Sequence, residues 1–109
     1  MENELVDNIW KMIEMWNESH FGMITPEIVL ISSPKYYCEV LRANYGEKIR
    51  YIKSDYQYRI EYFEIIGLKV PVIISDEMQK NVEYTLMFKK DYERLEKEKL
   101  YMKLNAMYE

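Results

Sequence analysis

The strongest constraint on the fold is a pair of short apolar runs that meet at a single glycine. Residues 62–66 and 68–74 are rich in isoleucine and valine, and Gly67 lies between them. Glycine readily adopts a positive φ angle, so two β-branched runs joined there predict antiparallel strands that turn back on each other. Because almost every side chain of the pair favours burial, we expect this hairpin to lie at the centre of the core.

Other patterns predict three helices and further strands around the hairpin. Apolar residues recur at helical spacing between residues 4 and 19. Ser33 and Pro34 predict the start of a second helix, since serine caps helices and proline fits the first turn. Residues 91–108 predict a third helix. Strands are expected over the apolar run 27–32 and over the alternating segments 48–53, 56–62 and 82–88.

These elements predict a single α+β domain over residues 1–109. We expect a mostly antiparallel sheet of four to five strands, with the N-terminal, middle and C-terminal helices packed around it. Pro71 cannot donate a hydrogen bond to a neighbouring strand, so strand 68–74 is expected to be an edge at that point, or to bulge there. Cys38 has apolar neighbours in its helix and is expected to be a buried, inert thiol.

No residue pattern predicts catalysis, a metal site or a cofactor. His20 is the single histidine, and no serine or cysteine nucleophile with an orienting carboxylate is identifiable around it. One histidine and one cysteine cannot form a zinc site, and three glycines do not form a phosphate loop. Glu61, Glu64 and Lys69 could converge as in a nuclease, but cross-strand charge pairs are the simpler interpretation. We therefore expect no enzyme.

The chain is expected to act in the cytoplasm without a membrane or nucleic acid. One cysteine excludes an internal disulfide, no apolar run reaches the length of a membrane span, and the acidic N-terminus does not resemble a signal peptide. Residues 50–59 interleave bases with tyrosines, a pattern that can stack on nucleic acid. The net charge of −4 disfavours that partner, and a solvated sheet face is the preferred interpretation.

Three groups of residues are candidate contacts for a protein partner. The first 20 residues carry five acids and one base, so the N-terminal helix has an acidic face, on which Trp10 faces either the core or a partner. The second half of the last helix is too apolar for a free tail, and we expect it to pack on its own domain or on another chain. The candidates are Trp10, Glu14 and Glu18; Tyr56 and Tyr58; and Leu100, Tyr101 and Leu104.

One segment resembles part of the major capsid proteins of tailed phages. It comprises a strand and a serine-proline-started helix over residues 27–44, then the run FEIIGLKVPVIISDEM with Gly67, Pro71 and Met78, then an alternating strand. The similarity covers residues 27–89, and small free-standing phage proteins look similar. The chain lacks the long spine helix and extended arm of capsid proteins. The resemblance thus implies a phage origin and an α+β unit, and it transfers no functional residue.

These observations favour a function in protein binding. The expected role is that of a phage-type protein that inhibits a bacterial host factor or defence effector, inside an infected cell. The alternative is a virion-associated or self-assembling structural protein, related to capsid proteins, that forms homo-oligomers through its C-terminal helix. Small size, absent catalytic motifs, the acidic tryptophan-bearing helix and the tyrosines and methionines support the first role. In the alternative, the terminal helix from Leu100 to Met107 would carry the contacts.

Overall fold

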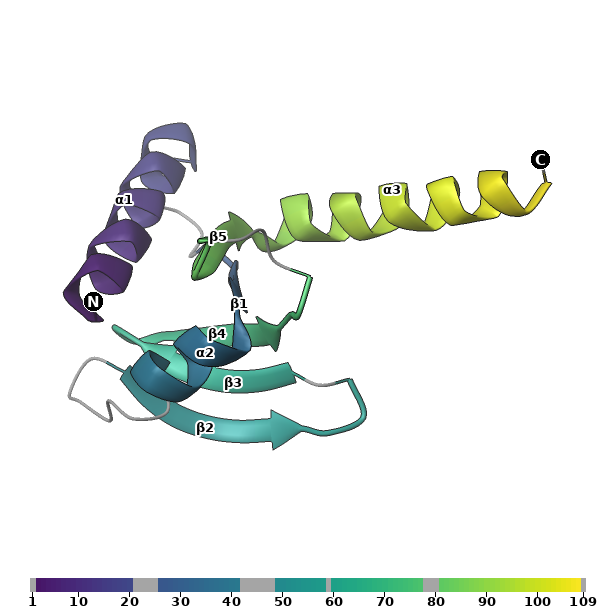
Figure 1. Cartoon of the computed structure of the whole chain (residues 1–109). Coiled ribbons are helices and arrows are strands. Elements are labelled where there is room, and N and C mark those ends of the chain that lie inside the picture. The colour runs from purple at the N-terminus through teal and green to yellow at the C-terminus, as the bar shows by residue number, and fades with distance from the viewer. Residues whose placement is uncertain (1, 21–25, 42–48, 59, 78–80, 109) are drawn as a thin grey trace.

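The computed structural model describes residues 2–20, 26–41, 49–58, 60–77 and 81–108 of the chain. A five-stranded sheet in the order β2-β3-β4-β1-β5 forms its centre, and β1 and β4 are the parallel pair in an otherwise antiparallel sheet. This arrangement confirms the predicted α+β fold (Figure 1). The elements are α1 (Glu2–His20), β1 (Ile28–Ser32), α2 (Pro34–Tyr36), the π-helical turn η1 (Tyr37–Leu41), β2 (Ile49–Asp55), β3 (Ile60–Ile65), β4 (Leu68–Ile74), β5 (Tyr84–Phe88) and α3 (Lys89–Tyr108).

The predicted hairpin is formed by β3 and β4. Ile65 pairs with Leu68, and the two residues between them, Ile66 and Gly67, have φ angles of 45° and 84°. Positive φ at both central residues matches the right-handed twist of the strands that the turn joins. The hairpin also supplies part of the core, since four of its side chains are fully buried: Phe63, Ile65, Val70 and Val72.

The core lies between one face of the sheet and the helices α1, α2 and η1. The inward side chains of α1 are Leu5, Val6 and Ile9, which are at most 4% exposed. They join buried residues of α2, η1 and four strands in one hydrophobic cluster. β1 is buried on both faces, as its apolar sequence predicted, with Val29 directed to the face opposite Ile28 and Leu30.

β4 is an interior strand of the sheet, but Pro71 lies on the part of it that pairs on one side only. β4 pairs with β3 on one side, where Pro71 lies opposite Tyr62 without a shift of register, and with β1 on the other. The parallel pairing with β1 runs from Val72, the residue after the proline. The strand is thus an edge at Pro71, as expected, without a bulge, and it gains its second neighbour from the next residue.

The predicted start of the middle helix is confirmed, whereas the burial predicted for Cys38 is wrong. The Ser33 hydroxyl accepts a hydrogen bond from the Tyr36 amide at 3.1 Å, and Pro34 is the first helical residue. The helix continues as the wider turn η1, which directs Tyr37 into the core and Cys38 towards solvent. The predicted end of this helix near residue 44 lies outside the described residues.

The strand predicted over residues 56–62 begins later than expected. β2 extends to Asp55, which pairs with Ile60, so the intervening residues form the connection between two strands. Residues 56–58 form a turn, and the backbone amide of Gln57 donates a hydrogen bond to the Asp55 carboxylate at 3.2 Å. An aspartate that bonds the backbone two residues later favours a turn over a continuous strand.

The C-terminal helix does not pack around the sheet. Figure 1 shows α3 leaving the end of β5 and extending away from the other elements, with the C-terminus at its far tip. Every residue from 93 to 107 is exposed. The prediction that this helix covers the sheet, and the option that it folds back on its own domain, are therefore wrong for these residues.

Candidate protein-binding surface

The projecting part of α3, residues 93–107, is the clearest candidate for a functional surface, and we call it the arm. Its base is fixed to the domain. The Lys89 amide donates a hydrogen bond to the Glu27 carbonyl at 2.9 Å, and the two side chains lie 3.7 Å apart as an ion pair. The Trp16 ring packs against Phe88 with ring centroids 5.3 Å apart, so α1 also supports the base. The arm is thus held at one end.

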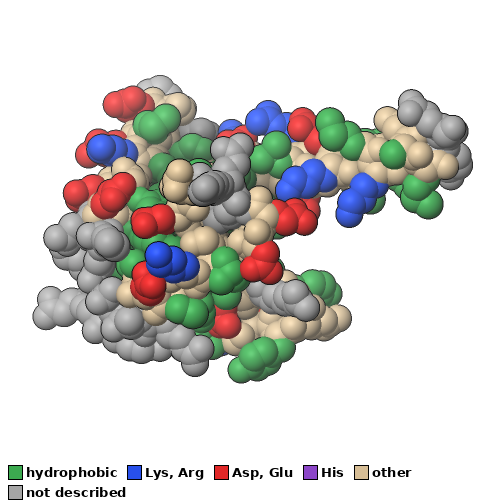
Figure 2. Space-filling model, viewed as in Figure 1, with side chains coloured by type: hydrophobic (Ala, Val, Ile, Leu, Met, Phe, Trp, Pro, Cys, Tyr) green, Lys and Arg blue, Asp and Glu red, His purple; other side chains and the backbone are tan. Residues whose placement is uncertain are grey.

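Six large apolar side chains of the arm are exposed to solvent. A surface helix normally buries such residues on one side, and an isolated helix of this length is only marginally stable in water. Figure 2 shows hydrophobic side chains distributed along the arm between charged ones. Their exposed fractions are 40% for Leu95, 58% for Leu100, 67% for Tyr101, 72% for Met102, 40% for Leu104 and 79% for Met107.

The apolar residues lie on two sides of the arm. At 100° per residue, Leu100, Leu104 and Met107 share one side, which we call the Leu100 flank. Tyr92, Leu95, Met102 and Ala106 share another, which we call the Leu95 flank. Since the two flanks face different directions, α3 has room for more than one contact.

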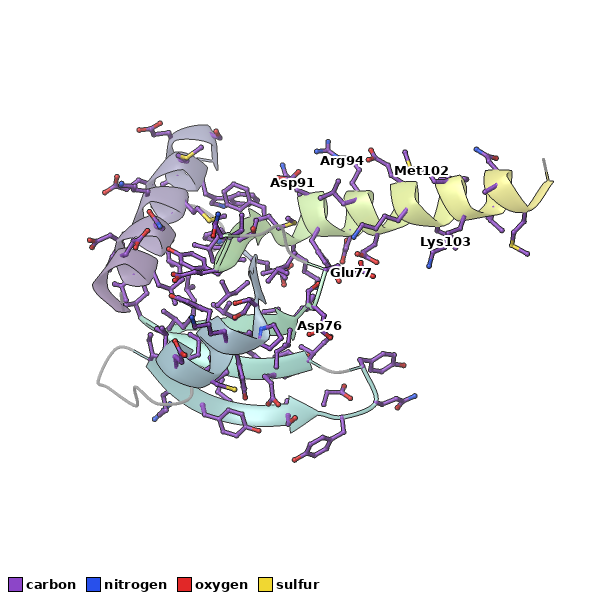
Figure 3. All side chains as sticks on the ribbon, viewed as in Figure 1. Asp76, Glu77, Asp91, Arg94, Met102 and Lys103 are labelled. Carbon is purple, nitrogen blue, oxygen red and sulfur yellow. The ribbon has the colours of Figure 1, made fainter. Side chains whose placement is uncertain are left out.

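Charged groups lie between the arm and the end of β4. Figure 3 shows Asp76 and Glu77 on the same side of α3 as Lys103, whereas Arg94 and Met102 point to the opposite side. A hollow of about 380 Å³ lies between α3 and the turn that Asp76 and Glu77 form after β4. It is lined by Glu77, Glu96, Lys99, Leu100, Met102 and Lys103. Acids and lysines therefore face one another across this side of the arm.

A second hollow, of about 390 Å³, lies where α3 meets the sheet face opposite the core. Its floor is largely apolar, and Glu27, Lys69, Lys89 and Glu93 add charges. Burial at this position raises the pKa of the Tyr92 hydroxyl, and the neighbouring Glu96 carboxylate raises it further. The apolar lining consists of Ile28, Val29, Ile60, Tyr62, Pro71, Ile73 and Tyr92.

The candidate residues of α1 form a separate surface. Trp10, Glu14 and Glu18 follow one another at intervals of four and share one side of the helix. The two carboxylates are exposed and Trp10 is 49% exposed, so this side of α1 is directed away from the core. Trp16, on another side, packs against Phe88 as described above.

The two candidate tyrosines form a third surface, at the turn between β2 and β3. Tyr56 is 87% exposed and Tyr58 is 67% exposed. Their exposure follows from the turn, because residues at a strand connection lack the sheet neighbours that an alternating strand would provide. The structure thus leaves the eight predicted residues on three separate elements.

The arm also contains an apolar residue that the sequence interpretation did not single out. Leu95 stands in a run dominated by charged residues, which hides its apolar side chain in the sequence. The seven-residue interval from Leu95 to Met102 was the available signal, because that spacing places two residues on the same side of a helix.

Polar side chains, acidic ones among them, also line a hollow of the described residues away from the arm. A hollow of about 610 Å³ between α1 and β5 contains Glu4, Asn8 and Glu83, and the Asn8 amide donates to the Tyr84 hydroxyl at 2.8 Å. No group of three histidine, cysteine or acidic side chains in the described part of the chain could hold a metal ion. The side chain of His20 lies outside the described residues.

The charge pairs predicted for the hairpin lie on its strands. Glu64 is opposite Lys69 on β4 and opposite Arg50 on β2, and the Arg50 guanidinium bonds the Glu64 carboxylate at 2.8 Å. Glu61 lies opposite Val72 in the β3–β4 pairing. Glu61 and Glu64 are three positions apart along the strand, so their side chains point to opposite faces.

The comparisons with other proteins leave the family open. No protein-family model, curated protein or solved structure matches this chain. None of the helices in the described segments is long and apolar enough to cross a membrane.

Proposed function

We propose that this protein acts by binding another protein through α3, and that its role lies in this contact rather than in catalysis. The observation that carries the proposal is the exposure of six large apolar side chains along a helix that projects from the domain. Exposed apolar surface of this kind typically marks a protein interface. Leucine, methionine and tyrosine side chains on a helix match the way amphipathic helices enter partner grooves.

The Leu100 flank is the part of α3 that we assign to this partner. Leu100, Leu104 and Met107 follow the i, i+4, i+7 spacing of residues that anchor a helix in a groove. Tyr101 borders them and offers a large ring with a polar tip. Within this proposal the partner is a bacterial host factor or defence effector and the chain is its inhibitor; the sequence resemblance supports only the phage origin.

Site-specific photocrosslinking tests the proposal in the cells in which the protein is made. A photoreactive phenylalanine analogue is placed singly at Leu104, Trp10 or Tyr58, one position on each candidate surface. We expect a protein adduct from position 104. Adducts from position 10 or 58 alone would move the binding surface to α1 or to the β2–β3 turn and overturn the assignment to α3.

A pair of charge substitutions provides the matched control. Leu104→Glu places a carboxylate on the Leu100 flank and should abolish the adduct and co-purification of the partner. Asn105→Glu introduces the same charge one residue later, on a different side of the helix, and should leave both unchanged. Equal loss in the two variants would attribute the effect to charge alone and contradict the proposal.

A further inference from the structure

The Leu95 flank has the spacing of a coiled-coil seam. Tyr92, Leu95, Lys99, Met102 and Ala106 are separated by three, four, three and four residues, the interval at which side chains face a neighbouring helix. Leu95 and Met102 are 40% and 72% exposed, and Ala106 is also exposed. The spacing and exposure of the Leu95 flank are therefore typical of a helix face that packs against a second helix.

The charge distribution along α3 identifies the kind of helix that fits. The two lysines at the base of α3 already contact the domain, because Lys89 pairs with Glu27 and Lys90 lies over the Trp16 ring. Beyond them, residues 91–98 contain four acids and two bases, a net charge of −2, whereas residues 99–108 contain two lysines and no acid, a net charge of +2. A second α3 in the antiparallel direction places each acidic half beside a basic half. A parallel pair would place like charges together, which is unfavourable.

We propose that a second copy of this chain covers the Leu95 flank, with the two α3 helices paired antiparallel about Lys99. In this register Leu95 lies opposite Met102 of the partner subunit, and the large Tyr92 ring lies opposite the small Ala106 of the partner subunit. Glu96 lies beside Lys103 of the partner subunit on the rim of the seam, and the same pair recurs at the symmetric position.

The position of Lys99 fits this arrangement. The two-fold axis sets Lys99 opposite Lys99 of the partner subunit, and the Glu96 carboxylate of the same helix, 3.6 Å from each ammonium group, offsets part of this repulsion. A single lysine on an otherwise apolar seam specifies one register at some cost in affinity. The antiparallel direction also keeps the two domains at opposite ends of the helix pair, because each α3 projects from its own domain (Figure 1).

Reciprocal charge reversal tests the antiparallel register. Within one chain, Glu96 and Lys103 are seven residues apart, about 10.5 Å along the helix axis, so they do not pair with each other. Glu96→Lys creates a chain with two lysines at these rim positions, and Lys103→Glu creates one with two glutamates. Each variant alone then sets like charges against each other, whereas an equimolar mixture restores both opposite-charge pairs.

The measurement is the molar mass of the full chain by sedimentation equilibrium over a concentration series. We expect the wild type to form a dimer of twice the 13.4 kDa chain mass. Each single variant should weaken dimerisation by roughly tenfold, and the mixture should recover wild-type affinity. Loss of the exposed Glu96–Lys99 pair cannot explain recovery, because that pair remains broken in the mixture.

Three outcomes would overturn this inference: a wild type that stays monomeric at all concentrations, a dimer unaffected by either single variant, or variants that weaken the dimer without recovery on mixing. Its failure is distinguishable from failure of the proposed function. The dimer uses the Leu95 flank and is measured with the purified chain, whereas the proposed function uses the Leu100 flank and is measured by crosslinking in cells.

Discussion

The rings of Tyr36 and Tyr84 lie 4.8 Å apart, centroid to centroid, with their planes inclined by 34°. This contact joins α2 to β5, and the hydrogen bond from Asn8 to the Tyr84 hydroxyl adds α1 to the same cluster. The Tyr36 hydroxyl is buried and has no hydrogen-bond partner among the described residues. Burial, supported by the nearby Tyr84, Glu83 and Glu4, raises the pKa of Tyr36 far above its usual value.

The buried Tyr36 hydroxyl costs stability at neutral pH. Tyr36→Phe removes a polar group that is shielded from water and retains the ring that packs on Tyr84. We expect the free energy of unfolding, measured in urea, to rise by about 1 kcal/mol. Tyr58→Phe, at an exposed turn position, is the control and should change nothing. A loss of stability in Tyr36→Phe would show that the hydroxyl makes a favourable bond.

The same cluster predicts a loss of stability in alkali. Unfolded tyrosines titrate near pH 10, and burial raises the pKa of both Tyr36 and Tyr84 in the folded state. Titration of these phenols therefore leaves the stability unchanged below pH 10 and lowers it as the pH rises above 10, by up to about 1.4 kcal/mol per pH unit for the buried Tyr36 and by less for the more exposed Tyr84.

Unfolding in urea at pH 9 and pH 11 measures this alkaline loss. We expect a shallower decline in Tyr36→Phe than in the wild type, because one of the two shifted phenols is absent. Identical declines in the two proteins would assign the alkaline effect to other groups.

The hairpin turn predicts different costs for two substitutions at Gly67. A Cβ atom there would meet no other atom within 4 Å, so any cost comes from the φ angle of 84° rather than from a clash. Gly67→Ala should lower the free energy of unfolding by about 1–2 kcal/mol. Gly67→Asn should cost clearly less, since asparagine tolerates this conformation. Equal losses measured by thermal unfolding would contradict a conformational cause.

Removal of the arm should leave the domain folded. A chain that ends at residue 93 keeps Tyr92 and the ion pair at the base of α3, and residues 94–107, which it loses, are all exposed. At concentrations where the chain is monomeric, we expect the free energy of unfolding to change by less than about 0.5 kcal/mol. Phe63→Ala, in the fully buried hairpin, should cost about 3–5 kcal/mol and calibrates the urea measurement. A large loss on truncation would mean that the arm packs on the domain.

The exposed thiol of Cys38 should react in the folded protein. We expect an aromatic disulfide reagent to modify it in buffer at nearly the rate seen in denaturant, because its side chain is directed to solvent. Cys38→Ser should abolish the reaction and alter stability by less than about 0.5 kcal/mol. Slow modification that requires unfolding would instead place the thiol in the core, as the sequence suggested.

The sequence by itself determined the local elements. The run of apolar residues on both sides of Gly67 specified the hairpin, because strand preference and turn chemistry act between neighbours. Ser33 and Pro34 specified where α2 begins for the same reason. The apolar half of α3 was also evident, and with it the candidates Leu100, Tyr101 and Leu104.

Tertiary structure decided the features that depend on which elements meet. β4 became an interior strand beyond Pro71 because β1 joined it on the other side, a pairing between distant segments that no local pattern encodes. The turn at residues 56–58 and the direction of Cys38 followed from strand pairing and from helix geometry. The separation of the arm from the sheet is likewise a tertiary property: an apolar helix face indicates that a contact forms, but its sequence does not specify whether the partner is its own domain or another molecule.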